Sequence, residues 1–193
     1  GRVTQVVENV QGTTTTRTFA YDSIGRLDQV RQNGTLVADY DYDINGNRIR
    51  LTTPTGVLSG VADAQDRLVS YGSATFTFGA NGELAQQIAG SDTITYSYDV
   101  LGNLLAVRLR DGTVVSYLVD GQNRRIGKKV NGFLTQGFLY QGQLSPIAEL
   151  DSNGVVVSRF VYGDRGNAPA YLMKSGATYR VLTDQLGSVR LVI

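Results

Sequence analysis

The chain contains no cysteine and no histidine, and it has only three prolines among 193 residues. Without cysteine it can form no disulfide framework and has no thiol nucleophile. Without histidine it lacks the commonest general base and the commonest metal ligand. No apolar run approaches the roughly 20 residues that a membrane-spanning helix needs. These absences argue against most catalytic, metal-binding and membrane-spanning classes of protein.

The chain also lacks an excess of charge of either sign, with 18 Lys+Arg against 17 Asp+Glu and a net charge of +1. Such a chain creates no field that would steer it to nucleic acid, and we expect no nucleic-acid partner. The nearest approach to a basic cluster contains no aromatic residue and comprises Arg124, Arg125, Lys128 and Lys129. We expect these side chains on a solvated strand–turn face rather than at a phosphate site.

Glycine, in contrast, is abundant, with 23 residues, and one stretch shows how it is used: residues 19–27, FAYDSIGRL. Phe19 and Tyr21 project from the same face of an extended segment. Asp22 can open a tight turn by accepting main-chain N–H bonds, and Gly25 can supply the positive φ that lets the chain reverse. The stretch therefore predicts a strand, a turn and a returning strand.

This unit recurs along the chain, with clear copies at residues 40–49, 76–84 and 96–104 and weaker ones at 61–68 and 117–124. Its glycine position recurs every 16 to 21 residues, and a period near 20 is the signature of a repeat array. Four replacements leave the turn geometry open where they occur: Asp66, Gly79, Asn123 and Gln141.

Between these units, runs of five to eight residues alternate apolar with Thr, Ser or Gln, and Asn33-Gly34 is a strong hairpin signal. No window keeps a 3.6-residue apolar period over three turns, although residues 62–68 could form one helical turn. We therefore predict an all-β fold of tandem hairpins in one continuous sheet, which curls because strand twist accumulates. The Tyr and Phe pairs are expected to form cross-strand ladders.

Several residues could carry chemistry, but each has a structural interpretation that we favour. We expect turn capping rather than metal binding from Asp22, Asp43, Asp63, Asp99 and Asp120. Asp39, Asp41 and Asp43 could chelate a cation or act as glycosidase-like acids, but nearby Arg48 and Arg50 are the expected partners.

The remaining candidates are also interpreted as structural. The tyrosines could stack on sugar rings, but each lies within a hairpin, which favours a structural ladder. Ser188 has no histidine or obvious lysine base beside it, so a nucleophile is not expected there. The sequence thus predicts no catalytic residue, no cofactor and no metal ligand.

The repeated Tyr-Asp-x-x-Gly-Arg/Asn-Leu units resemble the YD repeats of the bacterial Rhs family, which are shared with Tc-toxin C subunits and teneurins. The resemblance covers essentially the whole chain and includes residues 139–142, 149–154, 160–163 and 184–190 (DQLGSVR), which stand in the family's order. It implies a ribbon of β-hairpins spiralling into a hollow shell, which in bacterial members encloses a C-terminal effector, usually a toxin, released by self-cleavage. The family's self-cleavage motif has no counterpart in these residues, so we expect neither autoprotease nor effector in them.

The resemblance leads to a functional expectation with open alternatives. Residues 1–137 are expected to form a YD-repeat array, and residues 138–193 repeats that lead into the Rhs-associated core. The chain would be a non-catalytic segment of a larger exported bacterial protein, secreted or at the cell surface, with the rest of its own polypeptide as partner. The alternatives are a surface module that binds glycan or protein, and a filament or tube subunit whose copies join through open strand edges.

Overall fold

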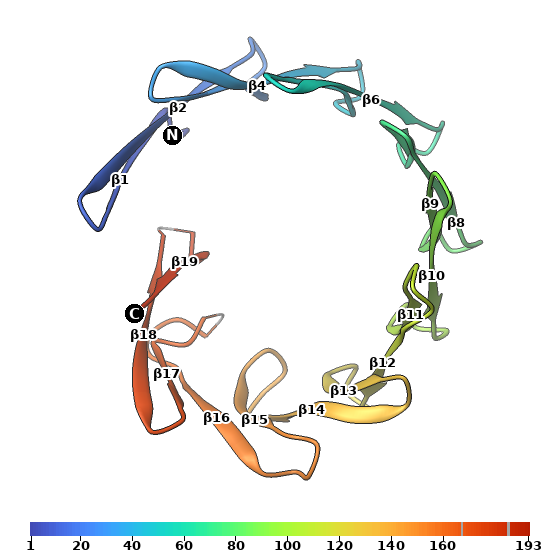
Figure 1. Ribbon diagram of the computed structural model, residues 1–193, viewed down its shortest axis with the longest axis vertical. Coiled ribbons are helices and arrows are strands. Elements are labelled where there is room, and N and C mark those ends of the chain that lie inside the picture. The colour runs from blue at the N-terminus through green and yellow to red at the C-terminus, as the bar shows by residue number, and fades with distance from the viewer. Residues whose placement is uncertain (167, 185) are drawn as a thin grey trace. The chain divides into compact units, whose positions relative to one another are not determined.

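A computed structural model of the chain describes residues 1–166, 168–184 and 186–193 (Figure 1). Within these residues the structure contains nineteen strands and no helix. The all-β prediction is therefore confirmed. Residues 62–68, where the sequence allowed one helical turn, instead end one strand and begin the next. A membrane-spanning helix is not found in the part of the chain that the structure describes.

The chain forms two compact units, residues 1–77 with 87–92 and residues 78–86 with 93–193. The first unit holds β1 (Gln5–Val10), β2 (Thr13–Tyr21), β3 (Leu27–Gln32), β4 (Thr35–Tyr42), β5 (Arg48–Thr53), β6 (Gly56–Ala62) and β7 (Leu68–Tyr71). Three strands have residues in both units: β8 (Ala74–Phe78), β9 (Leu84–Ala89) and β10 (Asp92–Tyr98). The second unit holds β11 (Leu104–Arg108), β12 (Val114–Val119), β13 (Arg125–Val130), β14 (Phe133–Tyr140), β15 (Pro146–Leu150), β16 (Val156–Val161), β17 (Tyr171–Lys174), β18 (Ala177–Thr183) and β19 (Val189–Val192).

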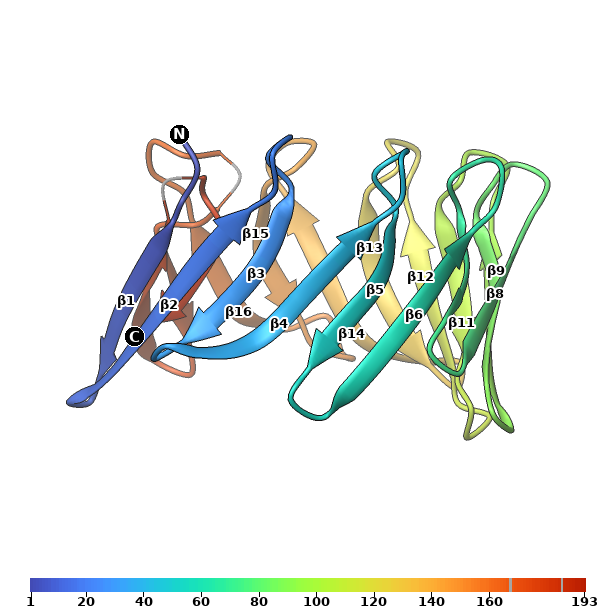
Figure 2. The same cartoon turned by 90° about the horizontal axis from the view of Figure 1, so that it is seen from above.

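Strands that are consecutive in sequence are also neighbours in the sheet. Each strand from β1 to β7 pairs antiparallel with the next, and so does each strand from β10 to β18. Turns therefore alternate between two ends of the strands, as Figure 2 shows for the first unit. We call the turns that follow even-numbered strands the YD turns, and their end of the strands the YD edge. The other turns form the opposite edge.

The sheet is a single layer with little buried core. Only small side chains and one valine are buried among the described residues, namely Ala38, Ala148, Ser158, Ala168 and Val181. No large side chain in that part of the chain is fully buried. The contacts that stabilise the sheet are thus mainly those between adjacent strands, as expected for a repeat array.

Glycine in the strand interiors makes room for large side chains of an adjacent strand. A Cβ atom on Gly60 would lie 3.2 Å from Cδ2 of Tyr71, and one on Gly127 would lie 3.0 Å from Cδ1 of Leu118. Both glycines are buried in the sheet. The repeat thus places a bulky residue over a glycine, which the sequence pattern alone did not reveal.

Candidate functional site

Seven of the YD turns share one main-chain geometry. In the first of them, the N–H of Asp22 donates to the carbonyl of Arg26 at 2.9 Å, and the N–H of Gly25 donates to the carbonyl of Asp22 at 3.0 Å. Gly25 has a φ of 92°, in the region that favours glycine. This is a type I turn followed by a left-handed residue. The same two bonds close the turns that begin at Asp43, Asp63, Gly79, Asp99, Asp120 and Asp184.

In five YD turns, both carboxylate oxygens of the opening aspartate accept hydrogen bonds within the turn. Oδ1 of Asp22 accepts from the N–H groups of Ile24 at 3.1 Å and Arg26 at 2.8 Å, and Oδ2 accepts from Nε of Arg26 at 2.6 Å. Equivalent bonds to both carboxylate oxygens occur at Asp43, Asp63, Asp99 and Asp120. The predicted turn capping is confirmed for all five aspartates.

These bonds favour the ionised form of the carboxylates. The side-chain hydrogen bond from Arg26 holds the pKa of Asp22 below its ordinary value, against an opposing effect of burial and with help from main-chain N–H groups. The pKa values of Asp63 and Asp120 are lowered in the same way by Arg67 and Arg124. At Asp43 and Asp99 the lowering hydrogen bond comes from an asparagine, and the pKa is lowered there too.

Three of the four turns with replaced residues keep this geometry, namely those with Asp66, Gly79 and Asn123. Asp66 and Asn123, which stand at the glycine position, have φ values of 60° and 59°, and short polar side chains tolerate this left-handed region. Gly79 lacks a capping carboxylate, yet its N–H still donates to the carbonyl of Glu83 at 2.7 Å. The turn at Gln141 keeps only the first bond, of 3.1 Å from its N–H to the carbonyl of Ser145, and Leu144 at the glycine position has no positive φ.

The last residue of a YD turn reaches the next turn along the edge. Nη1 of Arg26 donates to the main-chain carbonyl of Asp43 at 3.0 Å, and the guanidinium lies 4.6 Å from the ring centroid of Tyr42. In return, the hydroxyl of Tyr42 donates to the carbonyl of Leu27 at 2.7 Å. Two successive repeats are therefore tied together in both directions.

The same reciprocal contact recurs in the second unit. The guanidinium of Arg124 lies 5.2 Å from the ring centroid of Tyr140, and Nη1 donates to the carbonyl of Gly142 at 3.4 Å. The hydroxyl of Tyr140 donates to the carbonyl of Arg125 at 2.9 Å. The contact is thus a property of the repeat and not of one place in the chain.

Where asparagine replaces this arginine, its shorter side chain links the two turns through hydrogen bonds alone. Nδ2 of Asn47 donates both to Oδ2 of Asp43 at 3.0 Å and to Oδ1 of Asp66 in the next turn at 2.7 Å. Nδ2 of Asn103 likewise bridges Asp99 and Oδ1 of Asn123, the latter at 3.0 Å. The non-glycine residues Asp66 and Asn123 therefore serve as acceptors for the preceding turn.

Arginine guanidinium groups lie over several of the tyrosine rings. The sequence had led us to expect only contacts between the aromatic rings themselves. Arg48 lies 5.6 Å from the ring centroid of Tyr40 and 5.1 Å from that of Tyr71. Arg125 lies 3.9 Å from that of Tyr117. Such cation–π contacts stabilise the sheet and cover part of each ring.

The strand with alternating Asp and Tyr was the strongest candidate for paired acids. Its carboxylates have three separate partners: Asp41 pairs with Arg50, Asp39 accepts from Nε2 of Gln29 at 3.2 Å, and Asp43 caps its turn. The expectation for Arg50 is confirmed, but that for Arg48 is wrong, because this side chain packs on tyrosine rings. Within the described residues no group of three or more acidic side chains is placed to hold a metal ion.

Two further candidates from the sequence, the basic cluster at Arg124 and Arg125 and the hydroxyl of Ser188, lie in turns and strands. Arg124 pairs with Asp120 and Arg125 packs on Tyr117, so the basic cluster is partly neutralised within its own repeat. The main chain of Ser188 closes the last YD turn: its N–H donates to Oδ1 of Asp184 at 3.0 Å, and its carbonyl accepts from the N–H of Asp184.

A polar network that sequence reasoning missed spans β14 to β17. Oε1 of Glu149 accepts from Nε2 of Gln136 at 2.6 Å, and Oε2 accepts from Oγ of the buried Ser158 at 2.8 Å. Nζ of Lys174 lies 3.7 Å from Oε2. Burial acts to raise the pKa of Glu149, but these two hydrogen bonds and the Lys174 charge together lower it. The spacing of these residues in the sequence gave no signal of this network.

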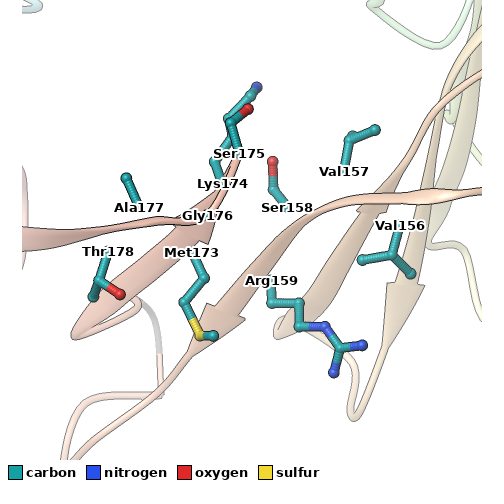
Figure 3. A pocket seen from close by; sticks show the side chains of 10 residues that line it. All are labelled: Val156, Val157, Ser158, Arg159, Met173, Lys174, Ser175, Gly176, Ala177 and Thr178. Atoms are coloured by element: carbon teal, nitrogen blue, oxygen red, sulfur yellow. The ribbon is translucent and has the colours of Figure 1, made fainter.

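A shallow cavity of about 200 Å³ lies beside this network, between β16 and the turn that joins β17 to β18. Figure 3 shows that Ser158 and Lys174 project to one side of the strands, whereas Arg159 and Met173 project to the other. This agrees with the register, which pairs Ser158 with Lys174 and Arg159 with Met173. Because Oγ of Ser158 donates to a carboxylate and is buried, the arrangement holds four strands together and offers no exposed nucleophile.

Comparison with known proteins agrees with this repeat geometry. The model of the family described as Teneurin YD-shell matches residues 1–193, which is the whole chain. The chain belongs to the teneurin YD-shell family. The resemblance to a YD-shell family seen in the sequence is confirmed.

Relatives of this YD-shell chain come from bacteria and animals. It is 29% identical over 157 residues to the tRNA3(Ser)-specific nuclease WapA of Bacillus spizizenii, which covers 76% of the chain and 6% of that protein. It is 27% identical over 175 residues to mouse Teneurin-1, which covers 88% of the chain and 6% of that protein. Among solved structures, the Photorhabdus luminescens Tc holotoxin pore is similar with a TM-score of 0.41 and 12% identity, over 94% of the chain and 14% of its own. The chain thus spans about 6% of the length of these curated relatives.

Proposed function

We propose that this chain is a non-catalytic wall segment of a YD shell in a larger exported bacterial protein, and that the shell encloses and delivers a C-terminal toxin or effector. The observation that carries the proposal is the match of the whole chain to the YD-shell family. In this proposal the chain works at the cell surface or after secretion. Its partner is the cargo domain of its own polypeptide.

The contacts within the repeat support a structural role. The polar atoms that could do chemistry at the YD edge are engaged in closing turns and in joining one turn to the next, as with Asp22, Arg26 and Asp43. A wall that encloses cargo needs such contacts at each repeat, because a lone hairpin is only marginally stable. Two relatives are named as tRNA nucleases. We assign that activity to no residue of this chain, which spans 6% of each of them.

The proposal also divides the chain into two parts at residue 137. Residues 1–137 would form a regular part of the array, and residues 138–193 would lead into the core that precedes the cargo. The looser spacing after Leu139 supports this division.

The binding alternative requires aromatic rings exposed together on one face. Two tyrosines, Tyr171 and Tyr179, are each 38% exposed. The register pairs Tyr171 with Arg180 and Tyr179 with Leu172. Because side chains alternate between faces, the two rings lie on opposite faces of the sheet and cannot form one stacking platform for a sugar. This favours the structural role.

The test uses the natural full-length polypeptide that contains this sequence. We expect limited proteolysis of the native protein to leave the C-terminal domain intact, while the same protease degrades that domain when it is produced alone. Intact mass and terminal sequencing would identify the protected fragment. Equal degradation in both forms would contradict enclosure, and a mature chain of only 20.9 kDa would leave no cargo to enclose.

A further inference from the structure

Several asparagines of the chain are each followed directly by glycine, and they are Asn33, Asn45, Asn81, Asn131 and Asn153. Asparagine is a chemically labile residue, because the main-chain nitrogen of the next residue can displace ammonia from its side-chain amide. Glycine has no Cβ to hinder that approach. All these sites share the same dipeptide, so a large difference in their reactivity has to come from the fold.

Three of these asparagine side chains are held by hydrogen bonds to other parts of the chain. Oδ1 of Asn33 accepts from the N–H of Thr16 at 2.9 Å, and Oδ1 of Asn131 likewise accepts from a main-chain N–H at 2.9 Å. Nδ2 of Asn45 donates to Oδ1 of Asp66 at 2.9 Å. Because the reaction turns the side chain toward the following nitrogen and releases Nδ2, these bonds oppose it.

At Asn153 the restraint acts on the main chain instead. This side chain is exposed, but Oδ1 of Asp151 accepts from the N–H of Asn153 and from that of Val155, each at 2.9 Å. The N–H of Gly154, which belongs to the attacking nitrogen, donates to the carbonyl of Asp151 at 3.1 Å. The carboxylate therefore clamps the chain on both sides of that nitrogen.

Asn81 lacks both kinds of restraint. Its side chain is exposed and makes no hydrogen bond within the part of the chain that the structure describes. Its turn opens with Gly79, which has no carboxylate, so only two main-chain bonds of 2.7 and 3.1 Å close the turn. Glu83 stands where other YD turns have the arginine or asparagine that bonds to the opening aspartate. The turn thus lacks both partners of the clamp.

We propose that Asn81 is a site of spontaneous deamidation, because the fold opposes the reaction least there. The main-chain nitrogen of Gly82 loses its proton to solvent and attacks Cγ of Asn81. The new C–N bond closes a cyclic imide, the bond from Cγ to Nδ2 breaks, and ammonia leaves with a proton taken from water. Water then opens the imide at either carbonyl, which gives aspartate or isoaspartate.

The product changes the turn between β8 and β9. Both outcomes place a new carboxylate close in sequence to that of Glu83. Isoaspartate also adds a carbon to the main chain, which misaligns the bonds that join Gly79 to Glu83 and Gly82 to Gly79. The reaction consumes only water, so it needs no enzyme and advances with the age of the protein. It goes beyond the shell proposal and does not depend on a cargo.

Ageing of the native chain gives the first test. The full chain is kept at mildly alkaline pH, and peptide mass spectrometry follows the conversion of each amide to the acid. Asn81 should convert about three- to tenfold faster than Asn153, since one net hydrogen bond opposes local opening by about that factor. The three asparagines with bonded side chains should also convert more slowly than Asn81. In concentrated urea, where the fold is lost, all of these sites should convert at similar rates.

A variant that rebuilds the clamp tests its cause. The double variant Gly79→Asp, Glu83→Asn recreates the arrangement of Asp99 and Asn103, in which both carboxylate oxygens accept bonds. Gly79 has no positive φ, and the second change removes the Glu83 oxygen that lies 3.3 Å from the position of the new Cβ. The variant should slow the conversion of Asn81 to about the rate of Asn153.

The reverse change is the matched control. Asp151→Gly removes the clamp at Asn153 and should raise the conversion of this residue to about the rate of Asn81, while Asn81 itself keeps its original rate. Equal rates at Asn81 and Asn153 in the native chain would overturn the proposal and leave the shell role untouched. A rate at Asn81 that the rebuilt clamp leaves unchanged would also overturn it.

Discussion

The guanidinium of Arg26 lies over the ring of Tyr42 and donates to the main-chain carbonyl of Asp43, so one side chain joins two successive YD turns. The same arginine also pairs with Asp22 in its own turn. A single residue thus closes one hairpin and fixes the position of the next. In a one-layer sheet with little buried core, such contacts between neighbours determine stability.

The variant Arg26→Ala should destabilise the first unit by about 1–2 kcal/mol, because it removes two charge-assisted hydrogen bonds and a cation–π contact at once. The measurement is the midpoint of urea unfolding. The matched control is Arg50→Ala, which breaks a pair whose side chains are 55% and 48% exposed and should cost under about 1 kcal/mol. Equal losses in the two variants would show that the link between turns contributes nothing beyond an ordinary surface ion pair.

Removing the hydroxyl group should have different effects on stability at Tyr42 and at Tyr71. Tyr42→Phe should cost about 0.5–1.5 kcal/mol, because the hydroxyl donates to the carbonyl of Leu27. The hydroxyl of Tyr71 is buried and has no hydrogen-bond partner among the described residues. Tyr71→Phe should therefore be neutral or stabilising, since it removes a buried polar atom that is unsatisfied. Urea unfolding of the two variants measures both effects. A clear loss of stability in Tyr71→Phe would contradict this prediction and reveal a partner for that hydroxyl, such as a buried water.

Gly60 should tolerate no side chain. A Cβ atom there would lie 2.9 Å from the carbonyl oxygen of Arg48 and 3.2 Å from Cδ2 of Tyr71, and main-chain atoms cannot move aside cheaply. Gly60→Ala should cost about 1–3 kcal/mol through overpacking. The control is Gly121→Ala, where the added methyl meets nothing within 4 Å and φ is not left-handed. It should be neutral or slightly stabilising in thermal unfolding, because alanine restricts the unfolded chain. If both variants unfold at the same temperature, the contact between Gly60 and Tyr71 has no energetic role.

The turns could be predicted from sequence because their determinants are local. Asp22, Gly25 and Arg26 lie within five positions of one another, so the pattern that forms the turn can be recognised in the sequence. Asp66 and Asn123 fit the same turn, because their side chains tolerate a positive φ. The repeat period then predicts antiparallel neighbours, which the strand register confirms.

The contacts between repeats could not be predicted in the same way. Whether Arg26 meets Tyr42 depends on the register of β3 against β4 and on the shift that each YD turn introduces. Arg48 was expected beside a carboxylate but packs on Tyr40 and Tyr71, because those rings lie within its reach on the same face. The network at Glu149 brings together side chains from four strands, and no short pattern in the sequence marks it.

Acid should weaken the fold through the carboxylates that cap turns. The pKa is lowered in the folded chain at Asp22, Asp43, Asp63, Asp99 and Asp120. It is also lowered at Asp111, whose Oδ1 accepts from the N–H of Thr113 in the turn between β11 and β12. A group whose folded pKa is depressed contributes stability at pH values above its unfolded pKa, about 3.9 for aspartate, and loses that contribution as the pH falls through the folded value. The urea midpoint should therefore decline below about pH 5. Since the chain has no histidine, it should change little between about pH 5 and 8.

The variant Asp120→Asn tests whether the capping carboxylates cause this decline. Asparagine keeps a side-chain oxygen that can cap the turn, but it cannot ionise and it loses the pair with Arg124. We expect a lower urea midpoint at pH 7 and a smaller further loss between pH 5 and pH 3 than in the original chain. Asp39→Asn is the comparison, because this residue accepts one bond from Gln29 and caps no turn, and it should lower the urea midpoint at pH 7 less than Asp120→Asn does. An unchanged slope in Asp120→Asn would mean that its turn is held by the main-chain bonds alone.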